Sequence, residues 1–269
     1  MRRDRPLIIA HRGGSPRDID NSREAFVHAL AVGVDMLECD LRRTRDGALV
    51  LLHDEAIRSD GRRLVVADTS YVDLKRALPW LLTLAEFLAE FGGALPFNLD
   101  LKTHGYELAA LAEIERHGLT ERVIFSTGHT LSLRRLAAAR PGLRLGLSRG
   151  HLNSHRSLRW LTFWLQWLLP RLLPLMLRAA DATAAMLQYR VVDRALVERL
   201  HRFGYEVFSW TVDTPAEAFR LTDAGVDGIA TNVPARLLAA FAEREEHQRV
   251  LGIDKDGTLV RTDPSTSSG

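Results

Sequence analysis

The sequence predicts a single α/β domain with the architecture of a (β/α)₈ TIM barrel, a closed ring of parallel strands surrounded by helices. Short apolar runs alternate with amphipathic helical segments along most of the chain, which is typical of a parallel sheet. Eight such strands can be assigned, the number that closes this barrel. The chain has 269 residues, close to the usual size of about 250 residues for the fold. A doubly wound open sheet is the alternative.

The strands are assigned to short runs rich in aliphatic and aromatic residues, bounded by turn-forming residues. In chain order they are LIIA (7–10), VDMLECDL (34–41), PFNLDLK (96–102), RVIFS (122–126), LRLGL (143–147), AAMLQY (184–189), YEVFSW (205–210) and VDGIAT (226–231). A further run, ALVLLH (48–53), follows the turn signal Arg45-Asp46-Gly47. We interpret this run as a hairpin outside the ring of strands.

The helices are assigned to intervening segments in which apolar residues recur on one face, as Phe26, Ala29 and Leu30 do. They are expected at 22–31, 105–117, 130–139, 193–203, 214–224 and 234–246, with one more ending at Gly92-Gly93. The barrel domain is expected to span residues 1–250. Residues 251–269 are interpreted as a hairpin around an Asp-Gly turn followed by a polar tail.

Composition restricts the expected location and partners. The formal net charge is +2, and the single cysteine, Cys39, excludes an internal disulfide and fits a reducing compartment. The apolar run after Pro6 is too short for a signal peptide. No apolar stretch reaches the about 18 residues of a membrane-spanning helix. We therefore expect a cytoplasmic protein without a nucleic-acid partner, and the sequence leaves the oligomeric state open.

Acidic residues stand at strand ends, where barrel enzymes place their active sites. Glu38 and Asp40 are two residues apart and so share a face of their strand, as do Asp100 and Lys102. Each unpaired carboxylate inside a barrel would cost several kcal/mol. One divalent cation would remove that cost, and oxygen ligands favour Mg²⁺ or Ca²⁺ over Zn²⁺. The alternative is a structural ion-pair network of these acids with nearby basic residues, namely Arg12, Arg42 and Lys102.

Two histidines end apolar runs at the same rim, His11 and His53. Histidine titrates near neutral pH, so a pair can divide general acid and general base catalysis. With a metal ion, Arg12 and Lys102, the set suits an anionic phosphate ester. Two further polar or aromatic residues end later strands at this rim, Trp210 and Asn232.

These residues lie in motifs that resemble the glycerophosphodiester phosphodiesterase family, within the phospholipase C-like phosphodiesterase barrels. The similar segments are IIAHRGG (8–14), DNSREAF (20–26), GVDMLECDLRRTRDGALVLLHDEAI (33–57), FNLDLK (97–102) and WTVDTPAEAFRLTDAGVDGIATNVP (210–234). The similarity runs from residue 7 to about 238, with a gap around 150–182. Together the motifs are highly specific, although each alone is weak.

The resemblance implies a metal-dependent enzyme that hydrolyses a glycerophosphodiester, or a lysophospholipid head group, to an alcohol and a phosphomonoester. His11 and His53 match the acid–base histidines, and Glu38 and Asp40 match metal ligands. Asp100 stands where the third ligand is usually glutamate. The remaining expected contacts, to phosphate or substrate, are Arg12, Lys102, Trp210 and Asn232.

Some positions depart from the family pattern. Ile19-Asp20-Asn21-Ser22 replaces the usual Pro-Glu-Asn-Thr, and Asn232 replaces an aspartate. Several positions are more similar to sphingomyelinase D-type phospholipases D, namely Asp100, Lys102, Trp210, Asp213 and Asn232. Two alternatives therefore remain: a phospholipase D-like lipid enzyme, and a non-catalytic barrel that binds phospholipid or membrane.

Residues 149–180 form a basic, aromatic insertion with Trp160, Phe163, Trp164 and Trp167 at helical spacing. Pro170 and Pro174 are expected to break this run, so it is not one spanning helix. It is interpreted either as an ordinary helix pair covering the core or as an interfacial element at the inner face of a membrane. A dimer contact is a further alternative.

Overall fold

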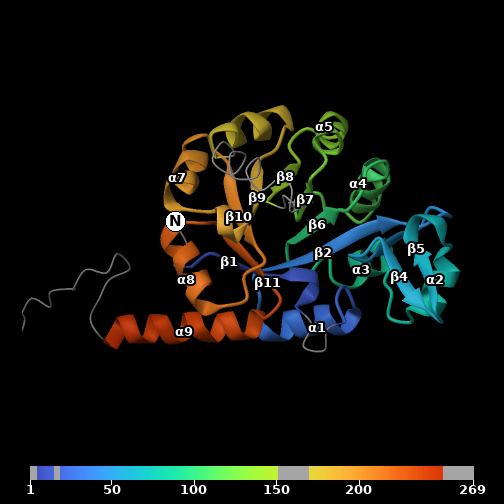
Figure 1. Cartoon of the computed structure of the whole chain (residues 1–269), viewed down its shortest axis with the longest axis horizontal. Coiled ribbons are helices and arrows are strands. Elements are labelled where there is room, and N and C mark those ends of the chain that lie inside the picture. The colour runs from blue at the N-terminus through green and yellow to red at the C-terminus, as the bar shows by residue number, and fades with distance from the viewer. Residues whose placement is uncertain (1–4, 15–18, 151–169, 251–269) are drawn as a thin grey trace, which may run out of the picture.

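The computed structural model describes residues 5–14, 19–150 and 170–250. Within these ranges, eight parallel strands form a closed barrel in the order β1-β2-β6-β7-β8-β9-β10-β11, with β11 pairing back to β1 (Figure 1). Their bounds are β1 Leu7–Ala10, β2 Met36–Arg43, β6 Phe97–Leu101, β7 Val123–Thr127, β8 Arg144–Arg149, β9 Ala184–Gln188, β10 Glu206–Trp210 and β11 Gly228–Thr231. The (β/α)₈ prediction is confirmed.

Helices surround the strands, as Figure 1 shows. They are α1 (Arg23–Val32), α3 (Leu84–Glu90), α4 (Glu107–Arg116), α5 (Thr130–Ala139), α7 (Arg194–Arg202), α8 (Pro215–Ala224) and α9 (Pro234–Val250). Local sequence sets several of their starts. Ser22 caps α1, Thr214 caps α8 ahead of a proline at its first position, and Thr83 forms a capping box with Glu86 at α3.

The core has two layers because side chains alternate along each strand. On β2, Leu37, Cys39 and Leu41 face outward into the main apolar cluster beneath the helices. Met36 faces inward, where a second cluster fills the barrel lumen with Ile9, Met36, Ile124, Ala184, Met186, Phe208 and Ala230. Glu38 and Asp40 share the inward face of Met36, so they lie above an apolar floor.

The run at 48–53 forms β3 (Leu49–Leu51), which pairs antiparallel with β2 outside the barrel, as predicted. The elements that follow were not predicted: the hairpin β4 (Ala56–Ser59) and β5 (Arg62–Val65), and α2 (Tyr71–Ala77). Asp60 and Gly61 both have positive φ in the hairpin turn, so this Asp-Gly pair was an available signal. The excursion starts and returns beside β2 and brings His53 close to the barrel mouth.

Residues 170–179 are helical, with Pro174 inside the helix. The prediction that Pro174 breaks this run is therefore wrong. Proline removes one intrahelical hydrogen bond, but Leu173, Leu177 and Ala180 are completely buried against the core, and this packing stabilises the helix. The tryptophan-containing part of the insertion and the expected tail at 251–269 lie outside the described residues. In the part of the chain that the structure describes, no helix is long and apolar enough to cross a membrane.

Candidate active site

Asp40 is the centre of the polar cluster at the barrel mouth. It is completely buried, and its carboxylate lies 2.7 Å from Lys102 Nζ and 3.2 Å from Arg12 Nε. Asn21 holds it further, because the Asn21 amide donates to Asp40 Oδ2 at 2.9 Å and accepts from the Asp40 backbone N–H at 3.0 Å. Burial alone would raise the pKa of Asp40, but the charges of Lys102 and Arg12 outweigh it and lower the pKa to about 2.

Glu38 lies two residues before Asp40 on β2, so its side chain is on the same face of the strand. The Arg12 backbone N–H donates to Glu38 Oε2 at 2.7 Å. Burial and the charge of Asp40 raise the pKa of Glu38 well above its usual value. The pKa values of these two neighbouring acids are therefore shifted in opposite directions.

The Arg12 backbone reaches Glu38 through a tight turn at the end of β1. Arg12 has φ of 54° in the short 3₁₀ turn His11–Gly13, and Gly13 has φ of 85°. A Cβ on Gly13 would come within 2.7 Å of the Ala25 side chain. The HRG motif thus requires glycine for both its backbone conformation and its close contact with α1.

Asp100 is drawn toward Lys102, whose Nζ lies 2.6 Å from Asp100 Oδ2, and it accepts from Ser126 Oγ at 3.0 Å. The Lys102 amine therefore bridges Asp40 and Asp100. This confirms part of the expected ion-pair network. Arg42 does not join it, because its guanidinium donates to the backbone carbonyl of His53 at 2.9 and 2.7 Å.

In the described ranges no group of three His, Cys, Asp or Glu residues is arranged to hold a metal ion, and the Lys102 amine lies within ion-pair distance of both Asp40 and Asp100. The donor set nonetheless fits a hard cation. Glu38, Asp40 and Asp100 supply carboxylate oxygens, and buried Asn98 Oδ1 has no hydrogen-bond partner. Asn98 is also the register partner of Glu38 on the next strand. Burial first, and then the charge of Asp40, raise the pKa of Glu38, and a bound cation would oppose both effects.

A hydrogen-bonded chain from β10 and β11 orients His11. Asp213 accepts from the Asn232 backbone N–H at 2.9 Å and from Asn232 Nδ2 at 2.8 Å. Asn232 Oδ1 must then face His11 Nδ1, 2.7 Å away. His11 therefore donates from Nδ1 and leaves Nε2, which lies 3.9 Å from Glu38 Oε2, for chemistry. Burial and the Arg12 charge lower the pKa of His11.

His53 is held in a similar way and lies in the electrostatic reach of Asp40. Its Nδ1 lies 2.8 Å from Asp54 Oδ1, which again leaves Nε2 free to exchange a proton. With 40% of its side chain exposed against 13% for His11, it is the more solvent-accessible of the pair. A cavity of about 640 Å³ is lined by His11, Arg12 and Asn232 and continues along the start of α9, whereas the three acids, Lys102 and His53 do not line it.

Asn21 and Ser126 belong to this cluster but are not predicted from the sequence, and Asn98 is given no role by the sequence motifs. The two-residue strand period could have placed Asn98 and Ser126 on the inward face. No local signal points to Asn21, because its contact with Asp40 depends on how the loop before α1 folds over β2. Trp210 lies at the end of β10, as expected.

We expect Asp213→Asn to lower kcat by about 10- to 100-fold with little change in KM. The new amide could donate to Asn232 and turn that side chain around, so that an N–H rather than an oxygen would face His11 Nδ1. Steady-state kinetics on a soluble substrate would measure this effect, with exposed Asp223→Asn on α8 as the matched control. An unchanged kcat would show that Asp213 supports only the fold.

Comparison with known proteins shows the family to which the chain belongs. Residues 11–236 match the model of the glycerophosphoryl diester phosphodiesterase family, a span that contains every site residue described above. The chain belongs to this family. A glycerophosphodiester phosphodiesterase of Caldanaerobacter subterraneus subsp. tengcongensis is 28% identical over 252 residues, covering 86% of this chain and 96% of the relative.

Two further known proteins are similar to this chain, one in sequence and one in fold. A lysophospholipase D of Homo sapiens is 23% identical over 263 residues, covering 85% of this chain and 84% of the relative. The structure of an Oleispira antarctica phosphodiesterase in complex with the product sn-glycerol-3-phosphate has a TM-score of 0.71. The two chains are 22% identical, and the match covers 88% of this chain and 97% of the Oleispira antarctica chain. This glycerophosphoryl diester phosphodiesterase family member is thus a phosphoric diester hydrolase of a generally metal-dependent family.

Proposed function

We propose that the enzyme hydrolyses glycerophosphodiesters to an alcohol and sn-glycerol 3-phosphate, with one divalent cation held by Glu38, Asp40 and Asp100. One observation carries the proposal: a buried acid pair and two histidines, each held through Nδ1, converge at one barrel mouth. The relatives' names support the same substrate class. Mg²⁺ and Ca²⁺ both suit an oxygen donor set, and the cation would neutralise negative charge on the phosphoryl group.

Arg12 and Lys102 would orient the substrate phosphate. Both carry positive charge at the mouth, and both are already held in place by Asp40. Because these side chains are fixed before substrate arrives, little ordering is needed when the phosphate binds. Trp210 is proposed to line the substrate site at the end of β10, and Asn232 to set the orientation of His11.

The two histidines would divide the proton transfers. The lowered pKa of His11 favours the neutral ring, whose Nε2 can accept a proton from the attacking oxygen. His53 would donate a proton to the departing alcohol. The attacking oxygen belongs either to water or to a neighbouring hydroxyl of the substrate, and the second route passes through a cyclic phosphate that water then opens.

Release of the head group from lysophospholipids is a second candidate activity, favoured by the similarity to a lysophospholipase D. It would use the same residues and a longer substrate. We further propose that residues 1–250 act as one catalytic domain. The insertion at 149–180 would then contact a membrane peripherally beside the mouth.

The test is release of choline or ethanolamine from glycerophosphodiesters and from the matching lysolipids, with and without EDTA. We expect turnover that EDTA abolishes and that added Mg²⁺ or Ca²⁺ restores. Phosphorus NMR during the reaction would detect a cyclic phosphate if a substrate hydroxyl attacks. No cation-dependent turnover of any of these substrates would reject the proposal in favour of a binding role.

A further inference from the structure

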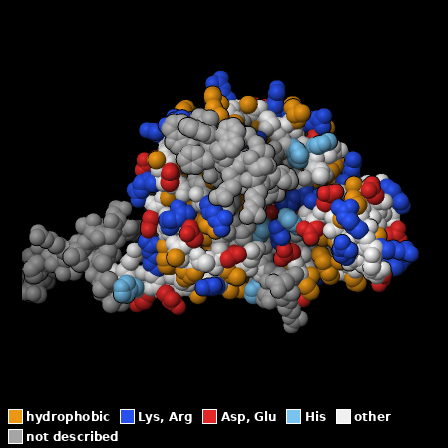
Figure 2. Space-filling model, in the orientation of Figure 1, with side chains coloured by type: hydrophobic (Ala, Val, Ile, Leu, Met, Phe, Trp, Pro, Cys, Tyr) orange, Lys and Arg blue, Asp and Glu red, His pale blue; other side chains and the backbone are white. Residues whose placement is uncertain are grey.

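Four exposed residues and the half-buried Arg149, from three neighbouring strand ends, meet at one side of the barrel mouth. We call this surface the α4–α5 shoulder and define it by His104, Leu108, His129, Leu131 and Arg149. Leu108 and Leu131 lie in the first turns of α4 and α5, and these turns face the mouth because each helix follows its strand. The rings of His104 and His129 are in edge-to-face contact, 5.6 Å between centroids. Figure 2 shows histidine side chains at the surface between α4 and α5.

The positive charge of the shoulder comes from Arg149, which has no acidic partner in the part of the chain that the structure describes. Between Glu121 and Asp181 the sequence has no Asp or Glu. The Arg149 guanidinium donates to the carbonyls of Gly128 and Ser148 at 2.8 and 2.9 Å, and no ion pair of Arg149 occurs among the described residues. It also lies 3.3 Å from Thr130 Oγ1 at the start of α5, where the helix dipole adds positive potential.

The acids closest to the shoulder in sequence do not neutralise it. Buried Glu107 pairs with Arg135 at 2.8 Å, and Glu113 pairs with Arg116 on the far turn of α4. Arg43 extends the basic surface toward β2, because its guanidinium donates to the Gly105 carbonyl at 3.1 Å. The surface therefore favours an anionic partner.

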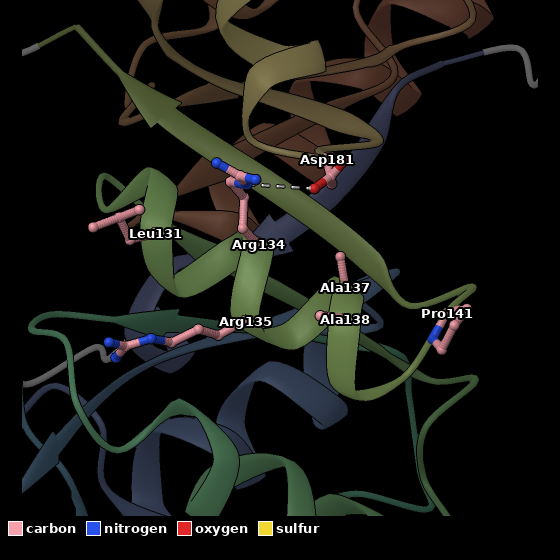
Figure 3. Close-up of a pocket in the computed structure, with 7 residues that line it drawn as sticks. All are labelled: Leu131, Arg134, Arg135, Ala137, Ala138, Pro141 and Asp181. Carbon is pink, nitrogen blue, oxygen red and sulfur yellow. Dashed lines mark ion pairs between the residues drawn. The ribbon is translucent and has the colours of Figure 1, made fainter.

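The same surface is apolar between its cations. Leu108 is 51% exposed and Leu131 is 66% exposed. Below Leu131 a groove of about 600 Å³ runs along α5, with a lining of Leu131, Ala137, Ala138 and Pro141 and with Arg134, Arg135 and Asp181 at its edges. Figure 3 shows Arg134 pointing across to Asp181 and Arg135 pointing away on the other side. Leu172 and Leu175 of the neighbouring helical segment are also exposed.

We propose that the α4–α5 shoulder docks the enzyme on an anionic lipid surface. Exposed leucines beside Arg149 and Arg43, for which no ion pair occurs among the described residues, match the two components of such a surface, acyl chains and negative head groups. A soluble anion would use the arginines but not the leucines. None of the five shoulder residues is acidic, and Asp181 on the adjoining groove is paired with Arg134. The inference rests on the proposed function in one respect: docking would present the mouth to lipid-derived diesters.

The experiment is co-sedimentation of the full chain with phosphatidylcholine vesicles, with and without phosphatidylglycerol. We expect binding to the anionic vesicles that weakens as salt is raised. The double variant Leu108→Gln, Leu131→Gln should bind the anionic vesicles at least about tenfold more weakly than the wild type. Arg149→Gln should bind about fivefold more weakly. The matched control is Val72→Gln with Phe203→Gln, two equally exposed residues on other elements, and it should bind as the wild type does.

Each variant is also assayed on soluble glycerophosphocholine, where wild-type turnover shows that the fold and active site are intact. Equal binding of the double variant and the wild type would overturn the docking proposal. Equal binding to neutral and anionic vesicles, or saturation of Arg149 by inorganic phosphate without vesicle binding, would also overturn it. Vesicle binding without turnover of any diester would refute the proposed function and leave the docking surface standing.

Discussion

Replacing either His11 or His53 with alanine is expected to lower kcat on a glycerophosphodiester by about 100- to 10,000-fold. Each ring is fixed by an oxygen on its Nδ1 side, Asn232 for His11 and Asp54 for His53, so the Nε2 atoms are the proton carriers that alanine removes. The two losses should be far from additive in the double variant, because both rings act in one reaction. Initial rates under saturating cation would measure the effect.

His117→Ala is the control for the histidine variants. His117 lies at the end of α4, away from the mouth, where its Nδ1 donates to the Glu113 backbone carbonyl at 2.9 Å. It should turn over substrate at the wild-type rate. Wild-type activity in either His11→Ala or His53→Ala would remove that residue from the acid–base assignment, whatever happened to the other.

Glu38→Gln is expected to lower turnover by about 100-fold or more while leaving the cation-free protein nearly as stable as the wild type. The raised pKa of Glu38 shows that burial disfavours its ionised form, a penalty that the uncharged glutamine avoids, and the new amide oxygen can still accept from the Arg12 backbone N–H. The free energy of unfolding without cation should therefore change by less than about 1 kcal/mol. Chemical denaturation would measure it.

The same variant should lose the stabilisation that a bound cation gives. A cation that binds only the folded protein raises the unfolding midpoint, and removing one ligand weakens that shift. Thermal unfolding with and without Mg²⁺ or Ca²⁺ compares the two proteins, with Glu206→Gln at the opposite end of the barrel as control. A full cation-induced shift in Glu38→Gln would contradict its role as a ligand.

The active site balances its charge in two different ways. Asp40 is ionised and shared between Lys102 and Arg12, whereas Glu38 accepts from the Arg12 backbone N–H, lies 3.9 Å from His11 Nε2 and has a raised pKa. A divalent cation would change this balance by stabilising both carboxylates in the ionised form. The described side chains form an ion-pair network, and the same carboxylates would serve as the donor set for the proposed cation.

The sequence by itself determined the fold class and most of the site. Alternating strands and helices predicted the barrel, and the two-residue period placed Glu38 with Asp40, and Asp100 with Lys102, on one face. The placement of side chains on one face depends only on geometry within a single strand, which local sequence specifies. The hairpin at β4–β5 was missed although its Asp-Gly turn was visible, because its strands are short and polar.

Only the tertiary structure decided which side chains touch. Barrel closure and register bring Lys102 of the β6 end between Asp40 and Asp100, Asn21 onto Asp40, and the Asp213–Asn232 chain onto His11. Such contacts join segments as many as 221 positions apart, and nothing in the spacing along one strand sets them. Pro174 shows the same principle, because packing of Leu173 and Leu177 into the core outweighs the local preference of proline to end a helix.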